Sequence, residues 1–396
     1  MPNQSLRKPS MSEIINVVNP RTGQIDYKIK AWTHDQIAKR AQTMRAAQRE
    51  WSAKPISGRA GQIAHLADKI AENFDDIATA LEIDTGRRAI ARHEVEGVIG
   101  ALNGWAASAP AMMPKSDWQN GRLQPHYKHT YQYVPYALVG VISPWNFPLT
   151  LSFIDAVPAL LAGACVMIKP SEITPRFADA LTPTIEMAGL GDILQFIQGD
   201  GKTGAALTDL VDMICFTGSV ETGKKVALSA AKRLIPANLE LGGKDPLIIT
   251  DTADLDVAAN LALRASVLST GQACQSIERV YVPRASYEVF LEKLTSLAKQ
   301  ITPNTPNINH GHLGPFIFRQ QAAKVMTQIT DALDKGARLL CGGKLIEDGG
   351  LWLMPSVLAD VNHSMDIMVE ETFGPVIPVQ AYDNIDEAIR LANDSE

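Results

Sequence analysis

The chain has 396 residues and a formal net charge of −6, with 46% hydrophobic and 20% charged residues. This length is too great for one compact core, so we expect two or three domains. The acidic balance argues against a general binder of nucleic-acid backbones, because such proteins carry basic patches. The four scattered cysteines lack C-x-x-C spacing, which argues against a disulfide scaffold and a structural zinc site.

The N-terminus and one long uncharged stretch bear on the cellular location. The segment MPNQSLRKPSMSEI contains no apolar run of the kind that a secretory signal needs. Residues 130–154 are long enough to span a bilayer, but Pro135, Pro144 and Pro148 would break a membrane helix. We therefore expect a buried α/β core, no membrane partner and a cytoplasmic location.

Residues 33–93 have the periodicity of helices. Their apolar residues recur at i, i+3 and i+4, and Thr33 stands where a helix cap is expected. Residues 122–136 instead alternate aromatic and polar side chains, which is typical of an exposed β-hairpin. We expect this hairpin to be an arm that pairs with another subunit.

Predicted strands then alternate with predicted helices. The strands are expected at 137–143, 164–170, 193–199 and 212–218, and the helices at 149–163 and 175–189. Thr174 is expected to cap the second helix, with Pro175 as its first residue and Gly189 as its stop. This alternation predicts a parallel, doubly wound sheet.

The series restarts after Glu240. Strands are expected at 245–250, 279–282, 337–343 and 376–382, and helices at 285–300 and 320–335. We therefore expect a cofactor-binding domain at 1–118 and 137–242, an oligomerisation arm at 119–136, and a catalytic domain at 243–396. The last segment, NIDEAIRLANDSE, begins an amphipathic helix without a glycine cap. We expect a truncated chain that is unstable or inactive by itself.

Two glycine loops compete for a cofactor phosphate. GDGKTG at 199–204 matches G-x-G-x-x-G after a predicted strand, while Phe196 occupies the place where a Walker A motif needs glycine. FTGSVETG at 216–223 joins a strand to a helix, whose N-terminus offers free N–H groups and a positive dipole end. Each loop alone is a weak signal, because such turns occur in any α/β protein.

Three short motifs hold polar side chains suited to chemistry. In PWNFP, two prolines would hold the Asn146 amide as a neutral donor to an oxyanion, although a rigid turn fits equally well. In LELGGK, Glu240 stands in an apolar setting, which would raise its pKa and favour a general base over a surface carboxylate. In EETFGP, Glu371 and Phe373 fit either a site or a turn built on Gly-Pro.

The segment STGQACQSIERVYV raises the question of what Cys274 does. It has no partner at metal or disulfide spacing. His310 and His312 form one close pair, but a solvated loop explains them better than a metal site, so we expect no metal. Cys274 is then either a core residue or a nucleophile, a role that suits the intrinsic reactivity of a thiolate.

The order of these motifs is more specific than any one of them. PWNFP, KPSExTP, FTGSxxxG, LELGGK, GQxC and EExFGP follow one another between VVNPRTG at 17–23 and EAIRLAND at 387–394. In this order they resemble the aldehyde dehydrogenase superfamily over nearly the whole chain. The resemblance implies a Rossmann-type parallel-sheet cofactor domain, a second α/β catalytic domain, a β-hairpin oligomerisation arm and a homodimer or homotetramer.

The resemblance also implies catalytic roles for three residues. Cys274 is similar to the family nucleophile, which attacks the aldehyde carbonyl to form a thiohemiacetal. The Asn146 side chain and the Cys274 N–H would hold the oxyanion, and Glu240 would activate the water that releases the acid. The implied activity is NAD(P)-dependent oxidation of a small-molecule aldehyde to a carboxylic acid.

Cofactor contacts follow from the same resemblance. Lys169 and Glu172 look like groups on the adenosine ribose, and the Glu172 carboxylate favours NAD because it would repel a 2′-phosphate. Lys169 still tolerates NADP. The other implied cofactor positions are the pyrophosphate turn with its neighbour, at Gly218, Ser219, Gly223 and Trp145, and the nicotinamide end, at Glu371 and Phe373. GDGKTG would lie on the adenine side.

Two alternatives stay open. A CoA-acylating dehydrogenase would resolve the thioester with a thiol instead of water, and Glu240 argues against it because that branch does not use this base. An inactive, truncated remnant would bind nucleotide without turnover.

Overall fold

The computed structural model describes residues 12–114 and 116–395. An antiparallel ribbon, β1 (Ile14–Val18) with β2 (Ile25–Lys30), leads into the helices α1 (His34–Ala53), α2 (Ile56–Glu72), α3 (Phe74–Thr85) and α4 (Arg88–Met112). The predicted cap at Thr33 is confirmed as a capping box. The Thr33 hydroxyl accepts from the Gln36 N–H, and the Gln36 side chain accepts from the Thr33 N–H.

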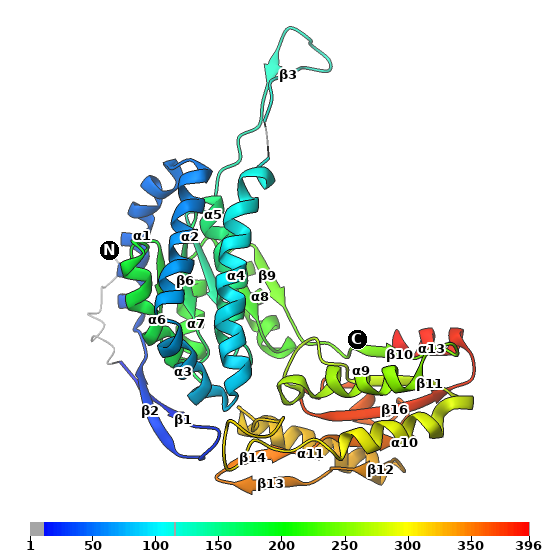
Figure 1. Ribbon diagram of the computed structural model, residues 1–396. Helices are drawn as coiled ribbons and strands as arrows, with labels where there is room; N and C mark the ends of the chain where they lie inside the picture. The colour runs from blue at the N-terminus through cyan, green and yellow to red at the C-terminus, as the bar shows by residue number, and fades with distance from the viewer. Residues whose placement is uncertain (1–11, 115, 396) are drawn as a thin grey trace, which may run out of the picture.

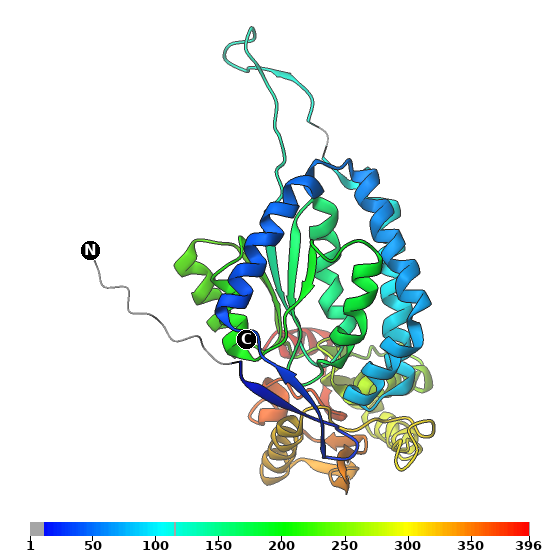
Figure 2. The same cartoon turned by 90° about the vertical axis from the view of Figure 1, so that its left-hand side faces the viewer.

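The first large sheet has the predicted parallel arrangement. Its five strands run in the order β7-β6-β5-β8-β9, and every neighbouring pair is parallel. Helices lie on both sides of this sheet, which confirms the doubly wound α/β class (Figure 2). The strands are β5 (Leu138–Ile142), β6 (Cys165–Lys169), β7 (Leu194–Phe196), β8 (Met213–Thr217) and β9 (Ala237–Glu240), and the helices between them are α5 (Pro148–Ala162), α6 (Arg176–Met187), α7 (Gly201–Thr208) and α8 (Val220–Arg233).

The prediction that Thr174 caps α6 is wrong. The helix begins at Arg176, and the Thr174 hydroxyl donates instead to the Trp145 carbonyl oxygen at 3.2 Å. The Arg176 N–H at the helix start donates to Asp84 of α3 at 2.8 Å. Because this capping carboxylate comes from a distant part of the chain, the local sequence pattern does not reveal it.

The second large sheet is mixed. Its order is β10-β11-β16-β15-β12, and only β12 runs antiparallel to its neighbour. The strands are β10 (Pro246–Ile248), β11 (Arg279–Pro283), β12 (Arg338–Cys341), β15 (Ser356–Ala359) and β16 (Val376–Tyr382); the other elements are the hairpin β13 (Leu345–Asp348) and β14 (Gly350–Leu353), and the helices α9 (Leu255–Val267), α10 (Tyr287–Ala298), α11 (Arg319–Asp334), α12 (Asp366–Val369) and α13 (Ile385–Ala392). Each large sheet packs its own apolar cores. The domain boundaries given above stay a prediction.

The arm projects away from the body of the molecule (Figure 1). Its paired part is much shorter than expected, because only β3 (Gln119–Asn120) and β4 (Lys128–His129) form ladder bonds. Several large apolar side chains on it are exposed: Trp118, Leu123, Tyr127, Tyr131, Tyr133 and Val134. Its role in oligomerisation stays a prediction. Within the described residues, no helix is both long and apolar enough to cross a membrane.

Candidate active site

A cavity of about 790 Å³ lies at the carboxyl ends of the strands of the first sheet. The last residues of β5, β6, β8 and β9 line it: Ile142, Lys169, Thr217 and Glu240. Loops of the second sheet close the other side with Cys274, Phe318 and Glu371. In parallel α/β sheets this edge is the place where ligands bind, because the strand-to-helix loops all open there.

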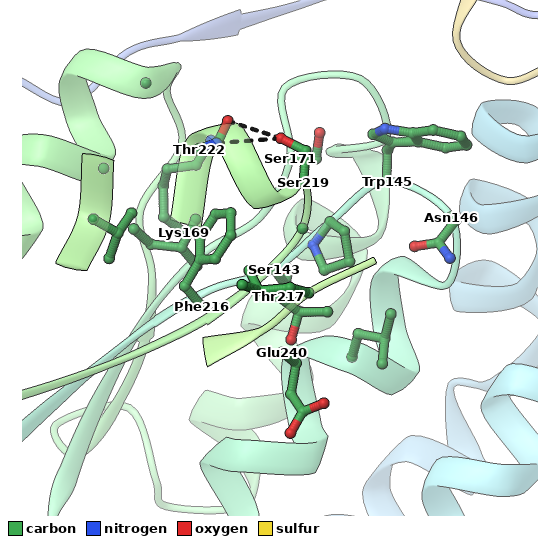
Figure 3. Close-up of a pocket in the computed structure, with 18 of the residues that line it drawn as sticks. Ser143, Trp145, Asn146, Lys169, Ser171, Phe216, Thr217, Ser219, Thr222 and Glu240 are labelled. Carbon is green, nitrogen blue, oxygen red and sulfur yellow. Dashed lines mark hydrogen bonds between the residues drawn. The ribbon is translucent and has the colours of Figure 1, made fainter. Parts of the chain in front are cut away.

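Nearly all residues singled out from the sequence meet in this cavity. Figure 3 shows Trp145 and Asn146 on the right of the view, Lys169 on the left, and Ser219 and Glu240 between them. The lining includes Trp145, Asn146, Lys169, Glu172, Gly218, Ser219, Glu240, Cys274, Glu371 and Phe373. Gly223 lies outside it. A Cβ at Gly223 would stand 2.5 Å from the Leu241 side chain, so this glycine serves the close packing of α8.

The loop before β11 presents the Cys274 thiol to the cavity, where the residue is exposed. The Asn146 side chain, which is 3% exposed, donates its amide N–H to the Gln272 carbonyl oxygen at 3.1 Å. This bond holds the expected oxyanion donor two residues from the cysteine. Partial burial raises the pKa of the Cys274 thiol, and the carboxylates of Asp245 and Glu371 raise it further. The raised pKa favours the thiol of Cys274 over the thiolate at neutral pH.

The backbone before Cys274 is strained. Ser269, Thr270 and Gly271 have successive φ values of 57°, 61° and 67°, in the left-handed region that non-glycine residues rarely adopt. A Cβ at Gly271 would collide with the Gly374 carbonyl oxygen. We call residues 269–278 the nucleophile loop, after the role expected of Cys274. This loop therefore lies directly against the turn that follows Phe373, and only glycine fits at this contact.

Replacing Gly271 with Ala is expected to lower the free energy of unfolding by about 3 kcal/mol, because of both strain and overpacking. Thermal unfolding of the purified variant measures this effect. Gly97→Ala is the control, since a Cβ there meets open space within 4 Å. Equal stability of the two variants would contradict the close contact at Gly271.

Glu240 ends β9, and its side chain is exposed instead of lying in the apolar setting expected. β9 is the edge strand of its sheet, and Glu240, its last residue, lines the open cavity. Asn238 lies on the same face of the strand and donates to Asp155 of α5 at 3.4 Å. Burial, and then the charge of Glu240, raises the pKa of Asp155. The role of Glu240 as general base stays a prediction.

The N-termini of α7 and α8 lie at the cavity, and the side chains that cap them differ in charge. At α7, the carboxylate of Asp200 already accepts from the N–H groups of Lys202 and Thr203, so it would repel a phosphate. At α8, the neutral Ser219 hydroxyl caps the helix and accepts from the Thr222 N–H at 3.4 Å. The start of α8 is therefore the better pyrophosphate cradle, and this supports the second of the two glycine loops.

Lys169 and Glu172 form a pair where the sequence predicts the adenosine side of the cofactor. Lys169 is 4% exposed, and it donates to Glu172 at 2.9 Å and to the Gly199 carbonyl oxygen at 3.0 Å. At the other end, the Glu371 carboxylate lies against Gly242, where a Cβ would collide with it. These groups fit a dinucleotide: carboxylates that could bind hydroxyls lie at both ends, with the helix start capped by Ser219 between them.

Two buried charges that the sequence patterns did not predict lie at α4: Arg87 directly before the helix and Glu94 within it. Arg87 donates to the carbonyl oxygens of Asn146 and Ser269 and so ties the PWNFP turn to the nucleophile loop. Glu94 accepts from the N–H groups at the start of α5, at Leu149 and Thr150. Burial lowers the pKa of Arg87 to about 10 and raises that of Glu94 to about 7.

A signal for one of these charges was present in the sequence. Glu94 interrupts the apolar stripe formed by Ala91, Val95 and Val98, and a charge in such a stripe needs a buried partner.

The described residues contain no group of three His, Cys, Asp or Glu side chains that would hold a metal ion.

A nucleotide-sized cavity at the ends of a parallel sheet, with a cysteine and a fixed amide donor beside it, defines a class of dinucleotide-dependent dehydrogenases. The model of the aldehyde dehydrogenase family matches residues 7–396. A putative NADP(+) succinate-semialdehyde dehydrogenase of Mycolicibacterium smegmatis is 35% identical over 379 residues, which are 95% of this chain and 73% of that protein.

Solved structures agree with this assignment. A putative aldehyde dehydrogenase, PutA, from Anabaena variabilis has a TM-score of 0.94 and 43% identity, covering 97% of this chain and 82% of that one. Lactaldehyde dehydrogenase from Escherichia coli has a TM-score of 0.90 and 32% identity, with coverage of 97% and 81%. The chain belongs to the aldehyde dehydrogenase family. It is an enzyme that oxidises an aldehyde with NAD or NADP.

Proposed function

We propose that the oxidation proceeds through a covalent intermediate on Cys274. The observation that carries this proposal is the Asn146 amide, buried and bonded beside the nucleophile loop within the cavity. The Cys274 sulfur forms a bond to the aldehyde carbon, and the carbonyl oxygen becomes an oxyanion held by the Asn146 amide and the Cys274 N–H. The thiol proton goes to solvent water, which reaches the exposed Cys274, so that Glu240 stays ionised for the later step.

A bound NAD or NADP would supply the acceptor for the hydride that the carbon of this intermediate loses, and Cys274 would then hold the acyl group as a thioester. Glu240 then takes a proton from water, whose oxygen attacks the thioester carbon. The carbon–sulfur bond breaks, the carboxylic acid leaves, and the thiolate is regenerated. Lys169, Glu172, Ser219, Glu371 and Phe373 line the part of the cavity that would hold and orient the cofactor.

In this proposal water accepts the acyl group from the thioester, whereas in a CoA-acylating enzyme the thiol of CoA accepts it. Glu240 lines the cavity and is open to solvent, so it is suited to present water to the thioester. We expect reduced cofactor to form from aldehyde and NAD(P) without added CoA. A strict requirement for CoA would favour the acylating alternative. A panel of succinic semialdehyde, aliphatic and aromatic aldehydes would define the substrate.

For the cofactor, we propose a preference for NAD over NADP. The Glu172 carboxylate lies beside the buried Lys169 ammonium, and its charge would repel a 2′-phosphate. Replacing Glu172 with Gln is expected to raise kcat/KM for NADP relative to NAD by about tenfold. Steady-state rates with both cofactors measure this ratio, with Glu292→Gln on α10 as the control, because Glu292 is exposed and does not line the cavity. An unchanged ratio would contradict the role of Glu172.

We also propose a cytoplasmic homodimer or homotetramer in which the arm contacts a second copy. The exposed aromatic side chains of the arm support this assembly, because such rings are enriched at protein interfaces. Light scattering of the purified protein tests it, and a monomer at micromolar concentration would contradict it.

A further inference from the structure

A buried ion pair between Lys244, in the loop before β10, and Glu278, directly before β11, contacts the segment that carries Glu371 and Phe373. Lys244 and Glu278 are 7% and 4% exposed, and the Lys244 Nζ lies 2.8 Å from the Glu278 Oε2. Burying such a pair costs desolvation energy, which only a complete set of hydrogen bonds offsets. The partners of the pair therefore indicate what it holds in place.

Those partners lie in the cofactor segment. The Glu278 Oε2 accepts from the Thr372 N–H at 2.8 Å, and its Oε1 accepts from the Phe373 N–H at 2.8 Å. Lys244 also donates to the Thr372 hydroxyl at 2.8 Å. Two successive backbone N–H groups are thus bound by one carboxylate, and such charge-assisted bonds are strong and directional. The backbone direction at 372–373 determines where the flanking side chains of Glu371 and Phe373 point.

The same segment contacts both ends of the nucleophile loop. Glu278 lies four residues after Cys274, and Gly271, three residues before it, lies against Gly374. The loop that presents the thiol and the segment at the nicotinamide end therefore share their supports.

We propose that Lys244 and Glu278 are positioning residues that set Glu371 and Phe373 relative to Cys274. This inference rests on the proposed function, in which Glu371 and Phe373 receive the nicotinamide end of the cofactor. Neither Lys244 nor Glu278 lines the cavity, so the pair acts through the segment that it holds.

The environment of Glu371 provides a readout that simple loss of structure would not produce. Burial, and then the charge of Glu278, raises the pKa of Glu371 to about 7, while Lys324 and Lys244 lower it. The Cys274 thiol also faces this carboxylate. An ionised Glu371 accepts bonds from ribose hydroxyls, so cofactor binding should strengthen as pH rises through this pKa. We call this rise of cofactor affinity with pH the limb of the binding profile. Removing the Glu278 charge lowers the pKa of Glu371, so the limb should move to lower pH.

The test compares Glu278→Gln with Glu278→Asp and the wild-type protein, by titrating NADH fluorescence from pH 5.5 to 9. In Glu278→Gln, we expect the Kd to rise about tenfold at high pH and the limb to shift down by roughly half a pH unit or more. Glu278→Asp keeps the charge, so its Kd should rise while the limb stays in place. Asp212→Asn is the matched control. Asp212 likewise binds a cation, Arg45 at 2.6 Å, and a backbone N–H, that of Leu138 at 2.9 Å, but it does not line the cavity.

A folded Glu278→Gln variant with wild-type Kd and an unmoved limb would overturn the inference. If that variant does not fold, Thr372→Val removes only the bond from Lys244, and a Kd raised about threefold would support the positioning role. An unchanged Kd in Thr372→Val would then overturn it. Because the titration needs no turnover, a failure to oxidise any aldehyde would count against the proposed function alone.

Discussion

Replacing Cys274 with Ala is expected to lower the rate of aldehyde oxidation by at least about 10⁴-fold, because no covalent intermediate can form. Cofactor binding should be retained, since the thiol is one small group on a cavity lined by many others. Steady-state rates of NAD(P)H formation measure the first effect, and NADH fluorescence titration measures the second.

Cys341→Ala is the matched control for this experiment, because Cys341 lies in β12 and does not line the cavity. It should keep wild-type activity. Turnover by Cys274→Ala near the wild-type rate would refute the covalent mechanism. Cofactor binding without any aldehyde turnover by the wild-type protein would instead favour the remnant that only binds nucleotide.

Replacing Glu240 with Gln is expected to slow steady-state turnover about 10³-fold, because the thioester then lacks the base that activates water. A first burst of reduced cofactor, close to one per active site, should persist. The charge of Glu240 contributes to the raised pKa of Cys274, so its removal does not hinder formation of the thiolate. Stopped-flow absorbance at 340 nm resolves the burst from the slow phase.

Glu370→Gln is the control, since Glu370 is exposed beside Glu371 and does not line the cavity. Loss of the burst together with the steady-state rate would place Glu240 in the first half-reaction instead. If added CoA restored fast turnover in Glu240→Gln, the thioester would be accessible to a thiol, and the acylating alternative would gain support.

The βαβ series was predictable because its signals are local. Apolar runs bounded by glycine and proline mark β5, β6 and β8, and the predicted ranges overlap the observed strands closely. β9 was missed because ANLE is short and half-exposed at the sheet edge. The paired part of the arm was overestimated for a related reason: alternation of aromatic and polar residues predicts extended chain, but ladder bonds depend on a partner strand.

The members of the site were predictable as residue types, and their arrangement was not. Cys274, Asn146, Glu240 and Glu371 stood out through motif order, and all of them line one cavity. Their environments differ in ways that sequence neighbours do not report. Glu240 is exposed because β9 is an edge strand, whereas Glu371 is partly buried because it packs against Gly242.

The family, the parallel sheet and the chemical groups of the site follow from the sequence, because they depend on local periodicity and on motifs that keep their spacing. The groups that support the site became known only from the folded chain. Arg87 and Glu94 bind backbone groups of the segment that holds Asn146, and Glu278 binds the backbone N–H groups of Thr372 and Phe373. A backbone carbonyl or N–H has no signature in the sequence, so contacts of this kind become visible only when the chain is folded.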